Sequence, residues 1–363
     1  MPIDDTRDLL REPAHAGTFY PASAAVLARL VDEQLAGATR RAAGDGGLSE
    51  GRRPAGSSPT VAHPVGFVVP HAGLVYSGPV AAAAWSTLRD RPPAAIVIAG
   101  TNHYVGGWQG VGVWPAGAWH TPLADVPVDA ALADRVVALG RPFAALPRVH
   151  LREHSIEVQL PFVVRACPDV PIVPMLVTFG DEAACLGAGA RLGGLLRELR
   201  SAGQDVVLAA STDFAHYPAA RDAEAVTEAL LPALLARDAV GLVRRERALL
   251  DEAIPGLACG MCGIEPAAFA LAAFEAMGLD DGVVLATATS ADVPGGDRYR
   301  TVGYAAVAFS RRAAPPAAGP DEAASPAAEP DAAPSPAAGS EEAASPAARS
   351  DEAASAGRRA QTP

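Results

Sequence analysis

The chain has 363 residues, a net charge of −12 and no lysine, so all 29 of its basic residues are arginine. Without lysine it can form neither a lysine Schiff base nor a lysine-dependent phosphate-binding loop. The acidic balance argues against nucleic-acid binding, which normally depends on a basic surface. No uncharged apolar run reaches the roughly 20 residues of a transmembrane helix, so we predict no membrane span.

Two segments lack the apolar pattern of a folded domain. Four imperfect ten-residue units of Pro, Ala, Ser and acidic residues occupy most of residues 313–363. They offer no bulky side chain to bury, so we predict a disordered tail. Residues 38–64 are rich in Gly, Ser, Pro and Arg and are predicted to form a mobile loop. We expect residues 1–312, with that loop, to form a single domain.

Features of the N-terminus and the cysteines bear on localisation. The first residues are acidic and polar, which predicts no secretion signal. The four cysteines are too few for a disulfide framework in a chain of this length. They are Cys167, Cys185, Cys259 and Cys262. We therefore expect a cytoplasmic protein.

Short apolar runs alternate with helical patterns along the chain. The predicted strands are 66–69, 95–99, 111–114, 172–177, 205–210, 283–289 and 302–309. The predicted helices are 24–36, 79–90, 128–139, 153–166, 182–202, 220–249 and 264–278. Uninterrupted apolar strands suit a sheet that is covered on both faces. The pattern predicts an α/β fold, an α/β/α sandwich around a largely parallel or mixed central sheet.

Polar residues capable of chemistry follow three of these strands. His71 follows strand 66–69, His103 follows strand 95–99, and Asp213 and His216 follow strand 205–210. Ligands gather where parallel strands end, and histidine binds metals or transfers protons. A single histidine after a strand is commonly a loop residue, but three such placements together favour a site. Here Asp213 would orient His216, because it lies three residues before it.

Two further motifs remain open to interpretation. Cys259 and Cys262 have the spacing of a zinc knuckle, but a structural zinc site needs a second pair nearby. A cysteine beside glycine is also often a small buried apolar residue. His154 and Glu157 are three residues apart, which predicts one face of helix 153–166. The apolar residues interleaved with them predict that this helix lines a pocket.

Six motifs occur in order between residues 11 and 309. They are REPAHAGTFY from Arg11, VPHAG ending at Gly73, GTNH ending at His103, EHSIEVQLPF from Glu153, STDFAH ending at His216, and ACG around Cys259. Together they resemble the Memo family, whose bacterial and archaeal branch is called AmmeMemoRadiSam system protein B. The resemblance implies a fold like that of the class III extradiol dioxygenases.

The same resemblance implies a metal site. Its ligands to iron or copper would be His71, His103 and Cys259, with Asp213 and His216 lining the same site. Cys262 is an extra thiol that could also bind the metal or form a disulfide with Cys259. Thr101 and Tyr104 depart from the family pattern, which commonly has Pro and a second His there. A ring-cleaving dioxygenase usually has a carboxylate in place of the cysteine ligand.

Three functions follow from these expectations. The first is a metal-dependent redox or dioxygenase-like protein of unknown substrate, in which His216 acts as acid or base and Asp213 orients it. The second is a non-catalytic module that binds a modified peptide or a small anion. The third is a partner in a pathway with a radical-SAM protein. We expect a small-molecule or peptide ligand, and neither nucleic acid nor membrane as a partner.

Overall fold

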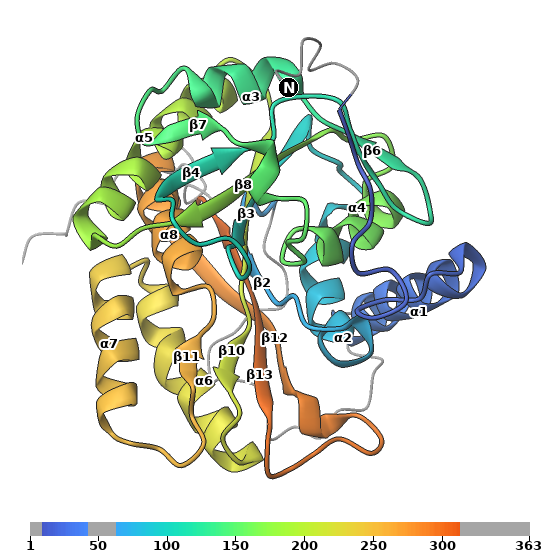
Figure 1. Ribbon diagram of the computed structural model, residues 1–363, viewed down its shortest axis with the longest axis vertical. Helices are drawn as coiled ribbons and strands as arrows, with labels where there is room; N and C mark the ends of the chain where they lie inside the picture. The colour runs from blue at the N-terminus through green and yellow to red at the C-terminus, as the bar shows by residue number, and fades with distance from the viewer. Residues whose placement is uncertain (1–8, 43–62, 313–363) are drawn as a thin grey trace, which may run out of the picture. The chain divides into compact units, whose positions relative to one another are not determined.

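The computed structural model describes residues 9–42 and 63–312. The predicted tail and residues 43–62 of the predicted loop lie outside the described residues. A ten-stranded mixed sheet runs through the centre (Figure 1). Its strands are β2 (Gly66–Val69), β3 (Ala95–Thr101), β4 (Gly110–Val113), β7 (Phe143–Ala145), β8 (Ile172–Thr178), β9 (Val206–Ser211), β10 (Phe214–His216), β11 (Cys259–Met261), β12 (Asp281–Thr289) and β13 (Val302–Ser310).

The sheet has a parallel centre and antiparallel flanks. The order is β11-β10-β13-β2-β9-β3-β8-β4-β7, with β12 paired to β13. The four central strands β2, β9, β3 and β8 are mutually parallel. β13 pairs antiparallel with β2, and β4 pairs antiparallel with β8. All seven predicted strands are present, each with bounds shifted by at most two residues, and the mixed sheet is confirmed.

Helices cover both faces of the sheet (Figure 1). They are α1 (Ala24–Ala42), α2 (Leu74–Trp85), α3 (Ala130–Val137), α4 (Leu160–Ala166), α5 (Glu182–Ser201), α6 (Ala220–Leu235), α7 (Ala239–Asp251) and α8 (Ile264–Met277). α1, α2 and α4 pack on one face, and the other five contribute to the core on the opposite face. Alternate residues of β3 enter the two cores, Val97 one and Ile98 the other, as the two-residue period of a strand requires. This is the predicted α/β/α sandwich.

Several helix predictions were wrong in their bounds. α1 continues to Ala42, so residues 38–42 are helical and do not belong to a loop. The predicted helix 79–90 is found five residues earlier, because α2 begins at Leu74 and ends at Trp85. The pattern over 220–249 is two helices, because Asp238 caps α7 by accepting a hydrogen bond from the Gly241 amide.

The predicted helix 153–166 is also shorter than expected. It becomes an α-helix only at Leu160, after a 3-10 turn over Glu157–Gln159. The Glu153 carboxylate accepts hydrogen bonds from the backbone amides that follow it, which keeps this segment out of a helix.

A second, three-stranded sheet was not predicted from the sequence. It consists of β1 (Leu10–Arg11), β5 (Ala118–His120) and β6 (Asp125–Pro127), in the order β1-β5-β6. Strands of two or three residues are too short to show an apolar period. The remaining 3-10 turns are Ser86–Leu88, Pro147–Val149 and Ser290–Asp292. Within residues 9–42 and 63–312, no helix combines the length and apolar character needed to cross a membrane.

Candidate metal centre

The ends of three adjacent parallel strands meet at one edge of the sheet. β9 lies between β2 and β3, and Val69 at the end of β2 is in register with Ser211 at the end of β9. His71, His103 and Asp213 each lie two residues beyond the end of their strand. Since these ends are adjacent, the side chains that follow them are brought into one region.

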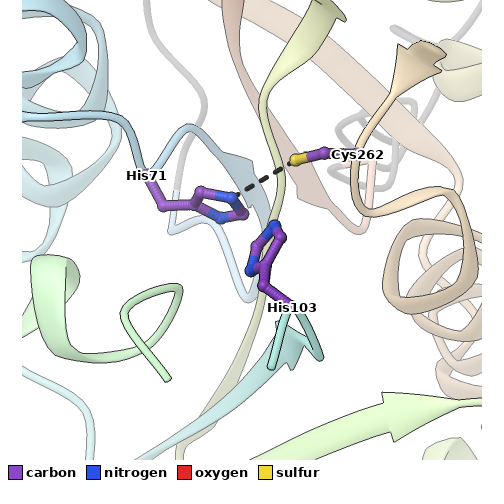
Figure 2. Close-up of side chains that lie close together, drawn as sticks. All are labelled: His71, His103 and Cys262. Carbon is purple, nitrogen blue, oxygen red and sulfur yellow. Dashed lines mark hydrogen bonds between the residues drawn. The ribbon is translucent and has the colours of Figure 1, made fainter. Parts of the chain in front are cut away.

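Cys262 completes a cluster with two of these histidines (Figure 2). Its Sγ lies 3.3 Å from Nε2 of His71, and one ligand atom from each of His71, His103 and Cys262 falls within 4.8 Å of the other two. His71 is buried, whereas the side chain of His103 is 25% exposed. The cluster therefore reaches solvent on the His103 side.

The structure places Cys262, and not Cys259, beside the two histidines. Cys259 lies on β11 opposite His216 of β10, and it belongs to none of the metal-competent clusters found among the described residues. Burial, and secondarily the nearby Glu246 and Asp213, raise the pKa of its thiol to about 12. The resemblance implies Cys259 as the ligand, whereas the thiol that lies beside the two histidines is that of Cys262.

Gly263 explains how Cys262 comes so close to the strand ends. A Cβ at position 263 would lie 2.4 Å from Oγ1 of Thr101 and 2.6 Å from Cβ of Thr212. Only glycine permits this approach without displacing Thr101 at the end of β3 or Thr212 directly after β9. The Gly263 amide also donates a 2.8 Å hydrogen bond to Thr212 Oγ1. The turn before α8 is thereby held against the sheet with Cys262 facing the histidines.

The hydrogen bonds of Ser211 determine which nitrogen of His71 faces the cluster. The Ser211 hydroxyl donates to the Ser155 carbonyl at 2.6 Å, and a hydroxyl has one proton to give. It must therefore accept at its other two contacts, from Gln159 Nε2 at 2.9 Å and from His71 Nδ1 at 3.0 Å. His71 then carries its proton on Nδ1 and presents the lone pair of Nε2 toward Cys262. This orientation is what a metal ligand requires.

Glu153 orients the ring of His103 as Ser211 orients that of His71. This role of Glu153 was not predicted from the sequence. Its carboxylate accepts from His103 Nδ1 at 2.9 Å and from the His103 amide at 2.7 Å. The amides of His154 and Ser155 also donate to it. Burial alone would raise the pKa of Glu153, but the hydrogen bonds and charge of His103 hold it near 2. No sequence signal separates Glu153 from other acidic residues beside a histidine, because its partners come from a distant strand end.

Asp213 and His216 lie at the cluster without contacting each other through a hydrogen bond. Asp213 Oδ1 accepts from the amides of His71 and Ala72, and the Asp213 amide donates to Cys262 Sγ at 3.3 Å. His216 forms a second metal-competent group with Asp213 and Cys262. Its Nε2 is buried with no partner among the described residues. The sequence had predicted that Asp213 orients His216, whereas the hydrogen bonds of Asp213 orient the backbone at His71.

Burial dominates the proton equilibria of the cluster. It lowers the pKa of His71 well below its ordinary value and that of His216 to about 4. It raises the pKa of Asp213 to about 7 and that of Cys262 well above its ordinary value. Each shift favours the neutral form, because charge is costly in a buried environment. A bound cation would reverse this preference for the thiol, since a coordinating thiol loses its proton.

His154 and Glu157 do not share a helix face. The His154 ring stacks on His103 with 4.5 Å between centroids and lies 5.2 Å from that of His71. Glu157 instead accepts from Arg11 and from the Tyr20 hydroxyl, each at 2.5 Å. His154 thus packs against both histidines of the cluster. Glu157 instead holds the N-terminal segment against the fold.

The donor set fits a first-row transition metal ion. Two imidazoles whose Nδ1 atoms have hydrogen-bond partners outside the cluster, together with a thiol, are ligands that iron, copper and zinc accept. The hydrogen bonds that Nδ1 of each ring donates, to Ser211 and to Glu153, match the outer partners that ligating histidines usually have. The unpartnered Nε2 of His216 adds a buried polar atom that a bound ion or its ligand would satisfy. The described residues therefore contain a possible metal-binding group.

Comparisons with known proteins agree with the motifs. Residues 11–308 match the model of the Memo-like protein family. The chain is 34% identical over 303 residues to a MEMO1 family protein of Methanopyrus kandleri, covering 83% of this chain and 99% of the relative. It is 35% identical over 297 residues to a MEMO1 family protein of Thermotoga petrophila, covering 81% and 97% respectively. Because the family match extends over residues 11–308, which include every residue of the candidate metal centre, the chain belongs to the Memo family.

Proposed function

We propose that the protein is a metal-dependent redox protein in which His71, His103 and Cys262 hold an iron or copper ion. The observation that carries this proposal is the meeting of two oriented imidazoles and a thiol within 4.8 Å. Thiolate ligation suits Cu(I) and iron, and an ion held by three protein ligands keeps open positions. When bound, the ion would supply a redox couple and an open position for oxygen or substrate.

Residues beside the cluster would accept a proton from the substrate and limit the access of water. Nε2 of His216 has no partner among the described residues, and burial lowers the pKa of this ring to about 4. A neutral imidazole beside the cluster can accept a proton from a substrate hydroxyl or thiol. His154 packs over His103, and the Tyr104 hydroxyl lies 3.2 Å from His154 Nδ1. These rings would limit the access of water from that side.

Metal content tests the ligand set. We expect the protein, reconstituted anaerobically with Fe(II) or Cu(I), to retain one ion per chain by elemental analysis. His71→Ala and Cys262→Ser should lose it, and Cys259→Ser is the matched control that should retain it. X-ray absorption should show a sulfur ligand in the wild type and also in the Cys259→Ser protein. Loss of the sulfur signal in Cys259→Ser alone would return the ligand role to Cys259, and unchanged metal in all variants would refute the metal site.

Oxygen consumption tests the redox part of the proposal separately. The loaded protein is mixed with catechols and small thiols in an oxygen-electrode cell, and His216→Asn is compared at equal metal content. We expect consumption by the loaded wild type and a decrease of about 100-fold in His216→Asn, since general acid–base catalysis contributes 10²–10⁴-fold. A loaded protein that consumes no oxygen with any donor would limit the function to metal binding.

A further inference from the structure

Two tyrosine–arginine pairs flank the metal centre. Tyr217 follows His216 directly, their ring centroids are 5.2 Å apart, and the Arg300 guanidinium lies 3.8 Å from the Tyr217 ring. Tyr104 follows His103 in the same way, with 6.2 Å between the rings. The Arg152 guanidinium lies 5.6 Å from the Tyr104 ring. In each pair, a positively charged guanidinium group therefore lies over the ring of a tyrosine that follows a histidine of the centre.

The two guanidinium groups have no acidic partner in the part of the chain that the structure describes. Neither Arg152 nor Arg300 forms an ion pair there, and both are exposed. An arginine that stacks on an aromatic ring keeps the N–H donors in its plane free for a carboxylate or phosphate. Tyr104 and Tyr217 are 41% and 37% exposed, so a ligand can reach both pairs.

The backbone holds the Arg300 pair in an uncommon conformation. Tyr217 has a φ of +75°, in the left-handed region that a bulky residue rarely adopts because its Cβ crowds the backbone. Two hydrogen bonds maintain it, from the Tyr217 amide to the Thr301 carbonyl at 2.7 Å and from the Thr301 amide to the Pro218 carbonyl at 2.9 Å. Thr301 is the neighbour of Arg300. Backbone hydrogen bonds thus connect the loop that carries Arg300 to Tyr217 and Pro218, directly after His216.

Flat rings form a wall around His154, which lies against His103 of the centre. Phe19 lies 4.4 Å from the His154 ring, and His15 stacks on Tyr104 at 5.8 Å. His154 in turn stacks on His103. Such ring faces favour offset stacking with a planar ligand. The centre therefore has both guanidinium groups and flat ring surfaces beside it.

We propose that the ligand of this centre is a small planar organic anion, an aromatic or conjugated carboxylate, whose carboxylate pairs with Arg300 beside His216. Its planar body would lie toward His103 and the ring wall. Arg152 would contribute less, because its guanidinium is farther from its tyrosine and the structure shows no comparable backbone tie. This inference rests on the proposed metal centre, since it names the substrate class of that site.

Binding of benzoate to the metal-loaded protein tests the inference. Calorimetric titrations compare benzoate with benzyl alcohol, which has the ring without the charge, and with acetate, which has the charge without the ring. We expect saturable benzoate binding and at least tenfold weaker binding of the other two. Arg300→Gln should weaken benzoate binding by about 10-fold or more, because a charge-assisted pair is lost, and Arg152→Gln by a smaller factor. Arg298→Gln, an exposed arginine on the same segment, is the matched control and should bind as the wild type does.

The possible results separate this inference from the proposed function. Metal content and urea unfolding are measured on every variant, and both should be unchanged in Arg300→Gln. Failure of the wild type to retain metal would refute the metal centre itself. Normal metal with no saturable benzoate binding, or equal binding to wild type and Arg300→Gln, would overturn this inference alone. Tighter binding of inorganic phosphate than of benzoate would also overturn it, because the planar body would then have no role.

Discussion

Glu153 and Glu157 are buried carboxylates four residues apart, and they serve different regions of the molecule. Each accepts hydrogen bonds from four donors. For Glu153 these are the amide and Nδ1 of His103 and the amides of His154 and Ser155. For Glu157 they are Arg11, the Tyr20 hydroxyl and the amides of Ala14 and His15.

The difference lies in how each negative charge is balanced. The permanent charge of Arg11, itself buried over the Trp119 ring at 4.3 Å, neutralises Glu157. No arginine touches the carboxylate of Glu153 among the described residues, where Arg11 reaches only its backbone carbonyl. Glu153 instead directs its charge through His103 toward the metal centre. The same residue type with the same number of donors thus supports a scaffold in one case and the proposed cation site in the other.

The largest expected effect is on stability, from Glu157→Gln. It leaves Arg11 buried without a charge partner, and breaking a buried pair on one side costs about 3–5 kcal/mol. We expect urea unfolding of the metal-free protein to show a loss of this size. Metal content should be unchanged, because Glu157 does not touch the ligands. Equal stability of variant and wild type would show that the Arg11 pair contributes nothing.

Glu153→Gln should affect metal affinity more than stability, the reverse of Glu157→Gln. The amide still accepts hydrogen bonds, so we expect metal-free stability to fall by only about 1–2 kcal/mol. Metal affinity should fall by about 100-fold, the upper end of the effect of losing an outer partner of a ligating histidine. Competition with a chelator of known affinity measures it. A variant that loses stability as Glu157→Gln does and keeps its metal affinity would remove the distinction between the two carboxylates.

Ser211→Ala should weaken metal binding less than Glu153→Gln. Ser211 orients His71 through a neutral hydrogen bond, and such bonds are about half as strong as those to a carboxylate. We expect a loss of about 10-fold in metal affinity, measured by the same competition. The conservative Ser211→Thr variant keeps a hydroxyl at this position and should restore most of the affinity. A larger loss in Ser211→Ala than in Glu153→Gln would place the main support of the site on the His71 side.

The sequence predicted the parts of the site that local patterns specify. His71, His103 and Asp213 each follow an apolar run, and parallel neighbours deliver such residues to one edge. The choice of Cys262 over Cys259 could not be read in this way. It depends on the pairing of β11 with β10 and on the contact of Gly263 with Thr101 and Thr212, which join distant segments.

Residues 153–157 show a second reason why part of the site could not be predicted from the sequence. Their apolar interleaving suggested a helix, but Glu153 binds the amides that follow it and the backbone departs from helical geometry. Once the helix is absent, a spacing of three no longer places His154 and Glu157 on one face. The roles of the two carboxylates then depend on contacts with His103 and Arg11, which lie far away in sequence, and no local pattern contains that information.

The last prediction concerns acid stability and sharpens the scaffold side of the comparison. His150 lies in that region, since its backbone carbonyl accepts from Arg11 Nε at 3.1 Å. Its ring Nε2 lies 2.9 Å from the Gly112 carbonyl, and Nδ1 is buried without a partner among the described residues. Burial lowers the pKa of His150 from 6.5 to about 3, which the Gly112 contact offsets only in part.

The pKa of His150 is lower in the folded protein than in the unfolded chain. Between these two values the unfolded chain binds a proton at His150 and the folded protein does not. The contribution of His150 to stability is therefore complete above pH 6.5 and is lost as the pH falls toward 3. Its share of the slope is at most about 1.4 kcal/mol per pH unit. Urea unfolding of metal-free protein between about pH 6 and 4 should show a slope smaller by up to this amount in His150→Phe. The buried histidines of the metal centre contribute equally to both proteins, so the difference isolates His150, and identical slopes would show that its ring titrates normally in the folded state.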